Sequence, residues 1–521
     1  MKNAMRVGAI GAMVSMLAVG AAQAQTVLRV GFTEAVSGID QIFDPQDQTA
    51  FTSRAVFNHL IDFDPETGNY LPALAESWEN PDDTTYIFHL RHGVTFQDGS
   101  PFNADDVVAL VNFVADPSKP LRVKDRFSWM DHAEKMDDYT VKIVSREPYA
   151  LAMLRLANDL PIYPDDSFSS LPDCAAASGS GSSDQKCKED FGRQPIGTGA
   201  YRVVKVNSQD GVVLERNPDY AWGNKVAPEA TFDQIVGVPI PDIQTQMAQL
   251  LSGGIDLVRN MPKDQLQQLA SMPRLEVWTG NNLNFYYLGL DALGRTTAKP
   301  LQDKRVREAI AYAINRDELI ESVIGNGAIK LDALCLPVMV ACTHSVDLPG
   351  YDPDKAKQLL AEAGYPNGFP VTITTVTLSR QVAEAIAGYL RAVGIQASLD
   401  NVTMANYRDK QNNNQQEILV STFSGGGIPH AASNTSMFFS EGPRNYYSEE
   451  LTAENTAALE AISPEDQNKA FGAILDKNNA DILLLPLASS PTSFVHDDKV
   501  TISGQTTSPY GGDYSMFMPA K

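Results

Sequence analysis

Residues 303–327 read DKRVREAIAYAINRDELIESVIGNG, and this stretch does more than any other to decide the fold. Its apolar residues, from Val306 to Ile324, recur near a 3.6-residue period, and Gly325 and Gly327 interrupt the pattern. Such a period places apolar side chains on one face of a helix, and glycine is a common stop. The stretch therefore predicts an amphipathic helix with a buried face.

Three other strings accompany this helix along the chain. They are LPALAESWENPDDTTYIFHLRHGVTFQDGSPFNADDVV at 71–108, YDPDKAKQLLAEAGYPNGF at 351–369 and QVAEAIAGYLRAVGI at 381–395. Together with residues 303–327, and in this order over most of the chain, they resemble the peptide/nickel/opine class of extracellular solute-binding proteins (family 5), which serve ABC importers.

The resemblance implies an α/β fold with two lobes around a ligand cleft, an extra subdomain in the first lobe, and two chain crossings between the lobes. The crossings are expected near residues 279–291 and 486–494. The expected divisions are a signal peptide at 1–24, lobe 1 at 25–280 with the subdomain at roughly 60–195, lobe 2 at 281–488, and a C-terminal return to lobe 1 at 489–521. The resemblance also implies a monomer that captures a small-molecule ligand without a cofactor and presents it to an inner-membrane permease.

The N-terminus has the three parts of a secretory signal peptide. Lys2 and Arg6 accompany an apolar core, residues 7–19, that is too short to span a membrane. Residues 22–24, Ala-Gln-Ala, have the small-x-small form of a cleavage site. No cysteine follows the core, so we expect a periplasmic protein that begins near Gln25 and carries no lipid anchor.

The chain is long and acidic, with 521 residues and a formal net charge of −23. Its length exceeds the usual limit of ~250–300 residues for one core, so at least two lobes are expected. Nucleic-acid binding needs clustered Lys and Arg, so no nucleic-acid partner is expected. An anionic ligand would need a local basic or amide-lined pocket against the overall field.

The four cysteines form two local pairs, Cys174/Cys187 and Cys335/Cys342. Three connectivities are open in principle. Export into an oxidising compartment favours disulfides, and the short loops favour pairing within each local pair. Neither pair has CxxC or zinc-finger spacing, so we expect neither redox catalysis nor a metal site.

Alternating strand and helix patterns, punctuated by Gly, Pro and Asn, predict α/β lobes. Residues 26–32 predict a buried strand, and the alternation in residues 84–99 around His92-Gly93 predicts a hairpin. Asn103 is expected to cap a helix, with Asp105 and Asp106 in its first turn. Their expected role is in folding.

Nothing in the sequence supports catalysis. It contains no GxSxG, HExxH, GxxxxGK[ST] or GxGxxG motif. Its seven histidines show no ligand spacing beyond His89 and His92, and adjacent acids such as Asp105 and Asp106 lie on different faces. We therefore expect no catalytic residue and no enzyme activity.

The ligand hypothesis rests on residues 423–430, FSGGGIPH. In dipeptide- and oligopeptide-binding members of the family that the chain resembles, an aromatic-rich segment after the corresponding strand carries an Asp that pairs with the peptide's amino terminus. No acid is present here, and a buried ammonium without a carboxylate is costly. The backbone N–H groups of Gly425, Gly426 and Gly427 can instead bind an anion, with Ser424 adding a hydroxyl. A flexible turn that keeps the cleft clear is an equal alternative.

Arg380 opens the predicted helix 381–393, after the predicted strand 371–376. It could provide a bidentate charge to an anionic ligand. A solvated capping residue is the plainer interpretation, and that alternative stays open.

Such a pocket is most similar to receptors for phosphorylated sugar opines, the agrocinopine-binding type. The favoured ligand is therefore an anionic sugar phosphate or opine. Other expected ligand contacts are Glu34, Asn260, Asn282 and Tyr287. The other candidates for stacking on a sugar are Phe285, Tyr286, Tyr446 and Tyr447, and at least half of the aromatic candidates are expected in the core.

Three alternatives remain. The first is a receptor for short peptides. The second, of a different class, is a periplasmic chaperone-like protein that holds peptides unselectively. The third is a metallophore receptor, for which His430 beside the glycines is the only support.

Overall fold

The computed structural model describes residues 25–34, 36, 38–43, 47–119, 121, 124–168, 192–193, 195–207, 209–280, 282–325, 327–423, 425–440, 448–503 and 514–520. The predicted signal peptide, the predicted Cys174–Cys187 pair, Ser424, Tyr446 and Tyr447 lie outside these residues. Within the described ranges, no helix combines the length and the apolar character needed to cross a membrane.

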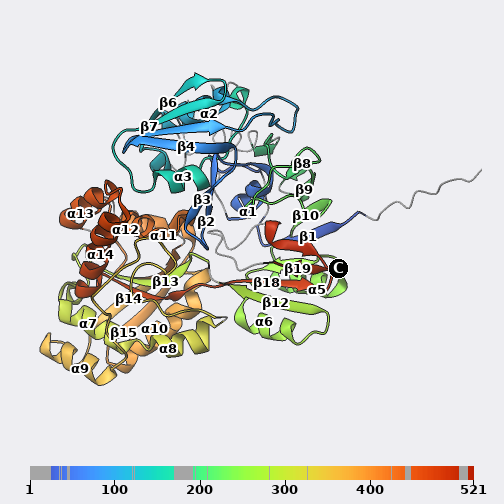
Figure 1. Ribbon diagram of the computed structural model, residues 1–521. Helices are drawn as coiled ribbons and strands as arrows, with labels where there is room; N and C mark the ends of the chain where they lie inside the picture. The colour runs from blue at the N-terminus through green and yellow to red at the C-terminus, as the bar shows by residue number, and fades with distance from the viewer. Residues whose placement is uncertain are drawn as a thin grey trace, which may run out of the picture.

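The first body is built on a seven-stranded mixed sheet, shown at the lower right of Figure 1. Its strand order is β12 (Leu275–Gly280), β18 (Thr492–Asp497), β11 (Leu257–Arg259), β1 (Val27–Phe32), β10 (Gln234–Pro239), β9 (Gly211–Arg216) and β8 (Tyr201–Asn207). Helices α1 (Asp47–Val56), α5 (Ile243–Ser252) and α6 (Lys263–Ala270) belong to this body. The predicted opening strand at 26–32 is confirmed as β1.

A four-stranded antiparallel sheet forms a second body, at the top of Figure 1. Its order is β4 (Ala75–Asp82), β5 (Thr85–Leu90), β7 (Thr140–Ser145) and β6 (Met130–Asp137), with helices α2 (Ala104–Ala115) and α3 (Ala152–Asn158) and short 3₁₀ turns at Lys124–Arg126 and Asp165–Phe168. The hairpin β2 (Ile61–Asp64) and β3 (Asn69–Pro72) precedes it. One apolar core runs through both bodies, so we call them together lobe 1.

Lobe 2 is built on a five-stranded sheet, at the lower left of Figure 1. Its order is β15 (Gln396–Val402), β14 (Pro370–Val376), β16 (Ile418–Phe423), β13 (Phe285–Leu290) and β17 (Leu484–Ser489). Its helices are α7 (Lys304–Ala313), α8 (Arg316–Leu319), α9 (Pro353–Glu362), α10 (Arg380–Ala392), α11 (Met404–Asn412), α12 (Ala431–Phe439), α13 (Glu449–Leu459) and α14 (Pro464–Asp481). A short ladder of β19 (Val500–Ile502) and β20 (Phe517–Pro519) follows the return strand β18.

The chain passes between the two large sheets twice. It leaves β12 at Gly280 and enters β13 at Phe285, then leaves β17 at Ser489 and enters β18 at Thr492. Figure 1 shows the two passages running side by side between the lobes. The placement of the lobe boundaries at 280 and 488 stays a prediction.

The prediction of a single helix over residues 303–327 is wrong. Helix α7 ends at Ala313, and Ile314 adopts an extended conformation. The Asn315 side chain then accepts the N–H of Glu318 and starts α8, which continues as a π-helical turn at Ile320–Ile324. A capping side chain inside an apolar period offers the backbone a local alternative to the continuous helix, so the buried face is kept while the axis is broken.

The predicted hairpin over residues 84–99 is also wrong. Strand β5 pairs with β4 on one side and with β7 on the other. Val94 and Phe96 are buried in the loop that follows. Because both edges of β5 are already paired, these residues contribute to the core from a loop.

The predicted cap at Asn103 is confirmed as a capping box. Asn103 Oδ1 accepts the N–H of Asp105 at 2.7 Å, and Asp106 Oδ2 accepts the N–H of Asn103 at 2.8 Å. Burial raises the pKa of Asp106 to about 6, although hydrogen bonds from Asn103 and Asp165 oppose this rise. Asp106 therefore serves the start of α2 through its carboxylate and Asp105 through its backbone N–H.

We expect Asn103→Ala to lower the free energy of unfolding by about 1 kcal/mol, because the first turn of α2 loses its side-chain acceptor. Asn103→Asp keeps an acceptor and is the matched control. Denaturant midpoints of the three proteins check this. Equal midpoints for wild type and Asn103→Ala would contradict the role of the cap.

Candidate functional site

In lobe 1, three parallel strands end at one edge of the sheet. Strands β10 and β11 both pair in parallel with β1. Glu34 follows β1 and is exposed, and Asn260 follows β11. In open α/β sheets, ligands bind outside the carboxyl ends of such strands. These two predicted contacts therefore share the edge where a ligand is expected.

Asn260 is held against the return strand β18. It has a left-handed backbone with φ of 53°, its N–H donates to the Ser493 carbonyl, and its Oδ1 accepts the Thr492 hydroxyl at 2.8 Å. The side-chain NH₂ is not used in these bonds. A ligand role for Asn260 stays a prediction.

Lobe 2 has a corresponding edge. Strand β14 is parallel to both β15 and β16, so the residues after β14 and β16 lie at one end of the sheet. Arg380 begins α10 shortly after β14, and the turn Gly425–Gly427 follows β16. The Arg380 guanidinium donates through Nε to Glu384 Oε1 at 2.8 Å, one helical turn ahead, and the side chain is 58% exposed. Its proposed contact with a ligand stays a prediction.

The Gly425–Gly427 turn has a backbone that disfavours side chains. Gly425 and Gly427 have φ of 59° and 79°, in the left-handed region. A Cβ on Gly425 would lie 3.0 Å from Asn434 Oδ1 and 3.1 Å from Ser433 Oγ. The left-handed backbone and these close contacts therefore disfavour a side chain at residue 425, and the anion-binding role of the amides stays a prediction.

The aromatic residues at the first crossing pack mainly into lobe 2. Phe285 is fully buried, and Tyr287 is 3% exposed with its ring 4.9 Å from that of Phe438. Asn282 is buried, and its Oδ1 accepts the N–H of Asn284 at 2.8 Å. Asn282 therefore shapes the crossing, and the ligand roles of Asn282 and Tyr287 stay predictions.

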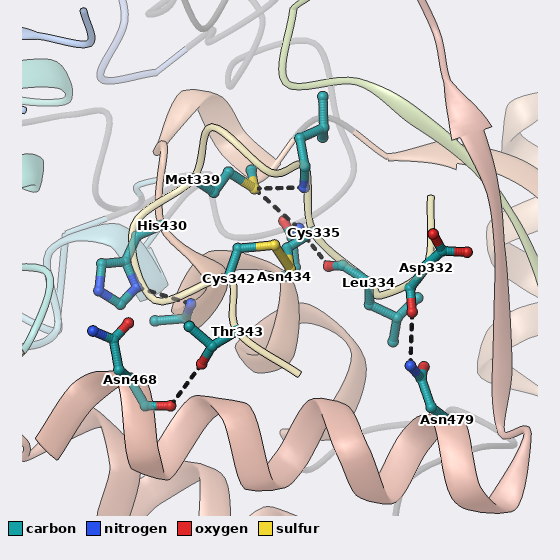
Figure 2. Close-up of a disulfide and its surroundings, with 12 residues drawn as sticks. Asp332, Leu334, Cys335, Met339, Cys342, Thr343, His430, Asn434, Asn468 and Asn479 are labelled. Carbon is teal, nitrogen blue, oxygen red and sulfur yellow. Dashed lines mark hydrogen bonds between the residues drawn. A yellow bond between two sulfur atoms is a disulfide. The ribbon is translucent and has the colours of Figure 1, made fainter. Parts of the chain in front are cut away.

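The predicted Cys335–Cys342 disulfide is present in the structure, with Cα atoms 5.8 Å apart. The loop that it closes is bonded to the segment after the glycine turn. Val340 N–H donates to the Pro429 carbonyl, and Ala431 N–H donates to the Val340 carbonyl, both at 2.9 Å. Figure 2 shows this loop between α12 and α14, with Met339 contacting Asn434. The disulfide loop thus holds the segment that directly follows the glycine turn.

His430 belongs to this support and has no free nitrogen for a metal. Its Nδ1 accepts the N–H of Ala432 at 3.0 Å and caps α12, and its Nε2 lies 3.2 Å from Gln467 Oε1. The described residues contain no group of three or more His, Cys, Asp or Glu side chains suited to a metal ion. The observation that favoured a metallophore receptor is therefore explained by a structural cap.

One contact between the lobes was missed by the sequence reasoning. Asn158, at the end of α3, donates through Nδ2 to the Gly427 carbonyl at 2.6 Å, and its Oδ1 accepts Arg54 Nη2 at 2.6 Å. Nearby, Arg155 pairs with Asp159 at 2.6 Å, an i,i+4 spacing visible in the sequence. Nothing in the sequence connects residue 158 with residue 427.

A hollow of about 530 Å³, which includes its open mouth, lies elsewhere in the molecule. Its lining comes from lobe 1 alone and includes Arg54, His59, Tyr220 and Tyr514. It shares Arg54 with the contact between the lobes, but no described residue of lobe 2 lines it.

The fold and the paired strand edges define a class, that of two-lobe proteins that bind a solute between their lobes. Residues 69–446 match the family described as bacterial extracellular solute-binding proteins, family 5 Middle, and the chain belongs to this family. These are transport binding proteins and not enzymes.

Individual relatives agree with this assignment. Glutathione-binding protein GsiB of Escherichia coli K12 is 30% identical over 364 residues, which span 68% of this chain and 66%, slightly under two thirds, of that protein. Periplasmic binding protein DppA from Helicobacter pylori, in complex with the peptide STSA, has a TM-score of 0.77 at 23% identity, over 95% of this chain and 99% of that one. MoaA from A. tumefaciens R10, in complex with mannopinic acid, has a TM-score of 0.75 at 21% identity, over 96% and 100%. The two solved structures show that the fold is shared.

The buried cap gives a prediction for acid stability. Burial lowers the pKa of His430 to about 4, and the bond to Gln467 opposes this only in part. Because the pKa of His430 is lower in the folded protein than the unfolded value of about 6.5, its protonation favours unfolding. The free energy of unfolding is therefore unaffected by this group above about pH 6.5 and falls as the pH drops toward 4. We expect this group alone to cost on the order of 3 kcal/mol by about pH 4.

His430→Asn keeps a capping acceptor and does not titrate, so it should flatten the acid loss of stability. Hydrogen bonds that the exposed His132 donates to the carboxylates of Asp131 and Glu134 raise its pKa, which makes His132→Asn the matched control. Urea midpoints from about pH 7 down to about pH 4.5 measure the difference. Parallel pH profiles for wild type and His430→Asn would contradict the assignment.

Proposed function

We propose that this chain is the periplasmic receptor of an ABC importer. It captures a small solute between its two lobes and presents it to an inner-membrane permease, by reversible binding without covalent chemistry. Membership of the solute-binding family supports this role. So does the likeness to a protein described as an ABC transporter-associated periplasmic binding protein.

The ligand that we propose is a small anionic solute, an opine or a sugar phosphate, as in the agrocinopine-binding type. The observation that carries this proposal is the Gly425–Gly427 turn, which ends β16 and meets Asn158 of the other lobe. Residues 423–430 contain no acid that could pair with an amino terminus. A donor-rich, acid-free turn suits an anionic oxygen. Of these two ligands, an opine is favoured by the likeness to a protein in complex with mannopinic acid.

A short peptide is the second candidate ligand. It is favoured by the likeness to a protein in complex with the peptide STSA and by the relative named for glutathione binding. We expect such a peptide to be held through its carboxylate end, because residues 423–430 contain no carboxylate that could pair with an ammonium.

A thermal-shift screen of the ligand-stripped protein tests these proposals. Opines, sugar phosphates, neutral sugars and di- to pentapeptides are compared at equal concentrations. A ligand at ~100 times its dissociation constant stabilises the folded protein by about 2.7 kcal/mol. A shift with opines or sugar phosphates only would support the proposed ligand. A shift with peptides only would identify a short peptide as the ligand instead. Similar shifts with all of these solutes would contradict the function of a selective receptor.

We expect Gly426→Asp to abolish binding of the solute found in this screen, because a carboxylate in the turn repels an anion. Its unfolding temperature without ligand should stay near that of wild type. Gly388→Asp is the matched control, since residue 388 is an exposed position on α10 where an added Cβ meets nothing within 4 Å. Unchanged binding by Gly426→Asp would exclude the turn from the ligand site.

A further inference from the structure

Helix α3 and the two residues before it form one of the contacts of lobe 1 with lobe 2. Leu151 and Leu154 belong to an apolar cluster formed mainly by lobe 2, and the Ala150 N–H donates to the Leu459 carbonyl of α13 at 2.7 Å. Asn158 reaches Gly427 from the same helix. Residues three and four apart share a helix face, so the face that holds residues 151, 154 and 158 lies against lobe 2.

Arg155 lies on this face, one turn from both Leu151 and Asn158. Its Nη1 lies 2.6 Å from Asp159 Oδ2, and Arg126 Nη1 lies 3.4 Å from Asp159 Oδ1. Asp159 is 1% exposed, and the two arginine side chains are 13% and 18% exposed. One buried carboxylate thus faces two mostly buried guanidinium groups. The cluster Arg126–Asp159–Arg155 therefore carries a surplus of one positive charge.

The hydrogen bonds of the cluster are also incomplete. Arg155 Nε is buried and has no hydrogen-bond partner among the described residues. Arg54, joined to the cluster through Asn158, has an Nε in the same condition. Burial by itself lowers the pKa of the Arg155 guanidinium, but the charge of the Asp159 carboxylate outweighs it and the pKa is raised. Arginine keeps its charge in proteins, and a buried charge is costly without a full set of partners.

We propose that the Arg126–Asp159–Arg155 cluster is the cationic subsite for the anionic group of the solute, on the lobe 1 side of the glycine turn. This inference rests on the proposed function and names the part of the site that selects an anion. Asp159 aligns the two guanidinium groups, whose planar forks match a pair of anionic oxygens. The surplus of one charge matches one carboxylate, whereas a phosphate dianion would also need the charge of Arg54.

Arg126→Gln is the decisive variant, because it removes the surplus charge and leaves the Arg155–Asp159 pair intact. Arg202→Gln is the matched control: Arg202 is an exposed lobe 1 arginine that pairs with Glu215. The probes are mannopinic acid and glutathione as carboxylates, glucose 6-phosphate as a phosphate, and sodium chloride at matched ionic strength. Melting temperatures and dissociation constants of the ligand-stripped proteins are the readout.

We expect wild type and Arg202→Gln to be stabilised equally by at least one anionic probe beyond the chloride control. Arg126→Gln should bind that probe about tenfold more weakly or worse. A larger effect of the carboxylates than of glucose 6-phosphate would identify the anion as a carboxylate, and the reverse would identify a phosphate.

The unliganded proteins separate this role from a purely structural ion pair. Arg126→Gln should melt no lower than wild type, since it removes a surplus buried charge, whereas Asp159→Asn should melt well below wild type. A large drop in the melting temperature of unliganded Arg126→Gln would overturn the subsite. An equal ligand shift in wild type and Arg126→Gln would also overturn it, while leaving the receptor function standing. No shift of wild type with any solute would remove the receptor function and the subsite together.

Discussion

Two short crossings of the chain constrain everything else in this protein. Gly280 pairs with Thr492 at the lobe 1 end, Phe285 pairs with Ser489 at the lobe 2 end, and the Ser490 N–H donates to the Asn284 carbonyl between them. The lobes are therefore joined by a nearly continuous antiparallel ribbon. Its backbone bonds fix the register of the two passages, so the lobes can change their angle but cannot slide past one another. The carboxyl-end edges of both large sheets thus keep a defined relation.

The local charge at the contact between the lobes is opposite in sign to the net charge of the whole chain. The protein carries a formal net charge of −23, which repels an anion at long range. Near the contact between the lobes, however, Arg54 bonds to Asn158, and Arg126 and Arg155 both pair with the buried carboxylate of Asp159. Interactions in a partly dry interface are screened much less than those at the surface. The proposed subsite for an anionic group rests on this local surplus of arginine.

The features that the sequence predicted correctly are local ones. The capping box at Asn103 depends on residues three apart, and the Cys335–Cys342 disulfide closes a loop of a few residues. The errors arose where a distant segment intervened. Residues 84–99 have the alternation of a hairpin, but both edges of β5 are taken, one by β4 and the other by β7, some fifty residues further on. The break in residues 303–327 was present in the sequence as Asn315, but the apolar period concealed it.

By itself, then, the sequence determined the family, through four strings in a fixed order, the α/β lobes, and the absence of an acid beside the glycines. It could do so because periodicity, caps and short motifs depend on neighbouring residues. Only the tertiary structure decided that Asn158 meets Gly427, 269 positions away, and that two arginines share one buried carboxylate. Such contacts depend on how whole lobes pack. The free energy of burying those charges is set by surroundings that no local pattern records.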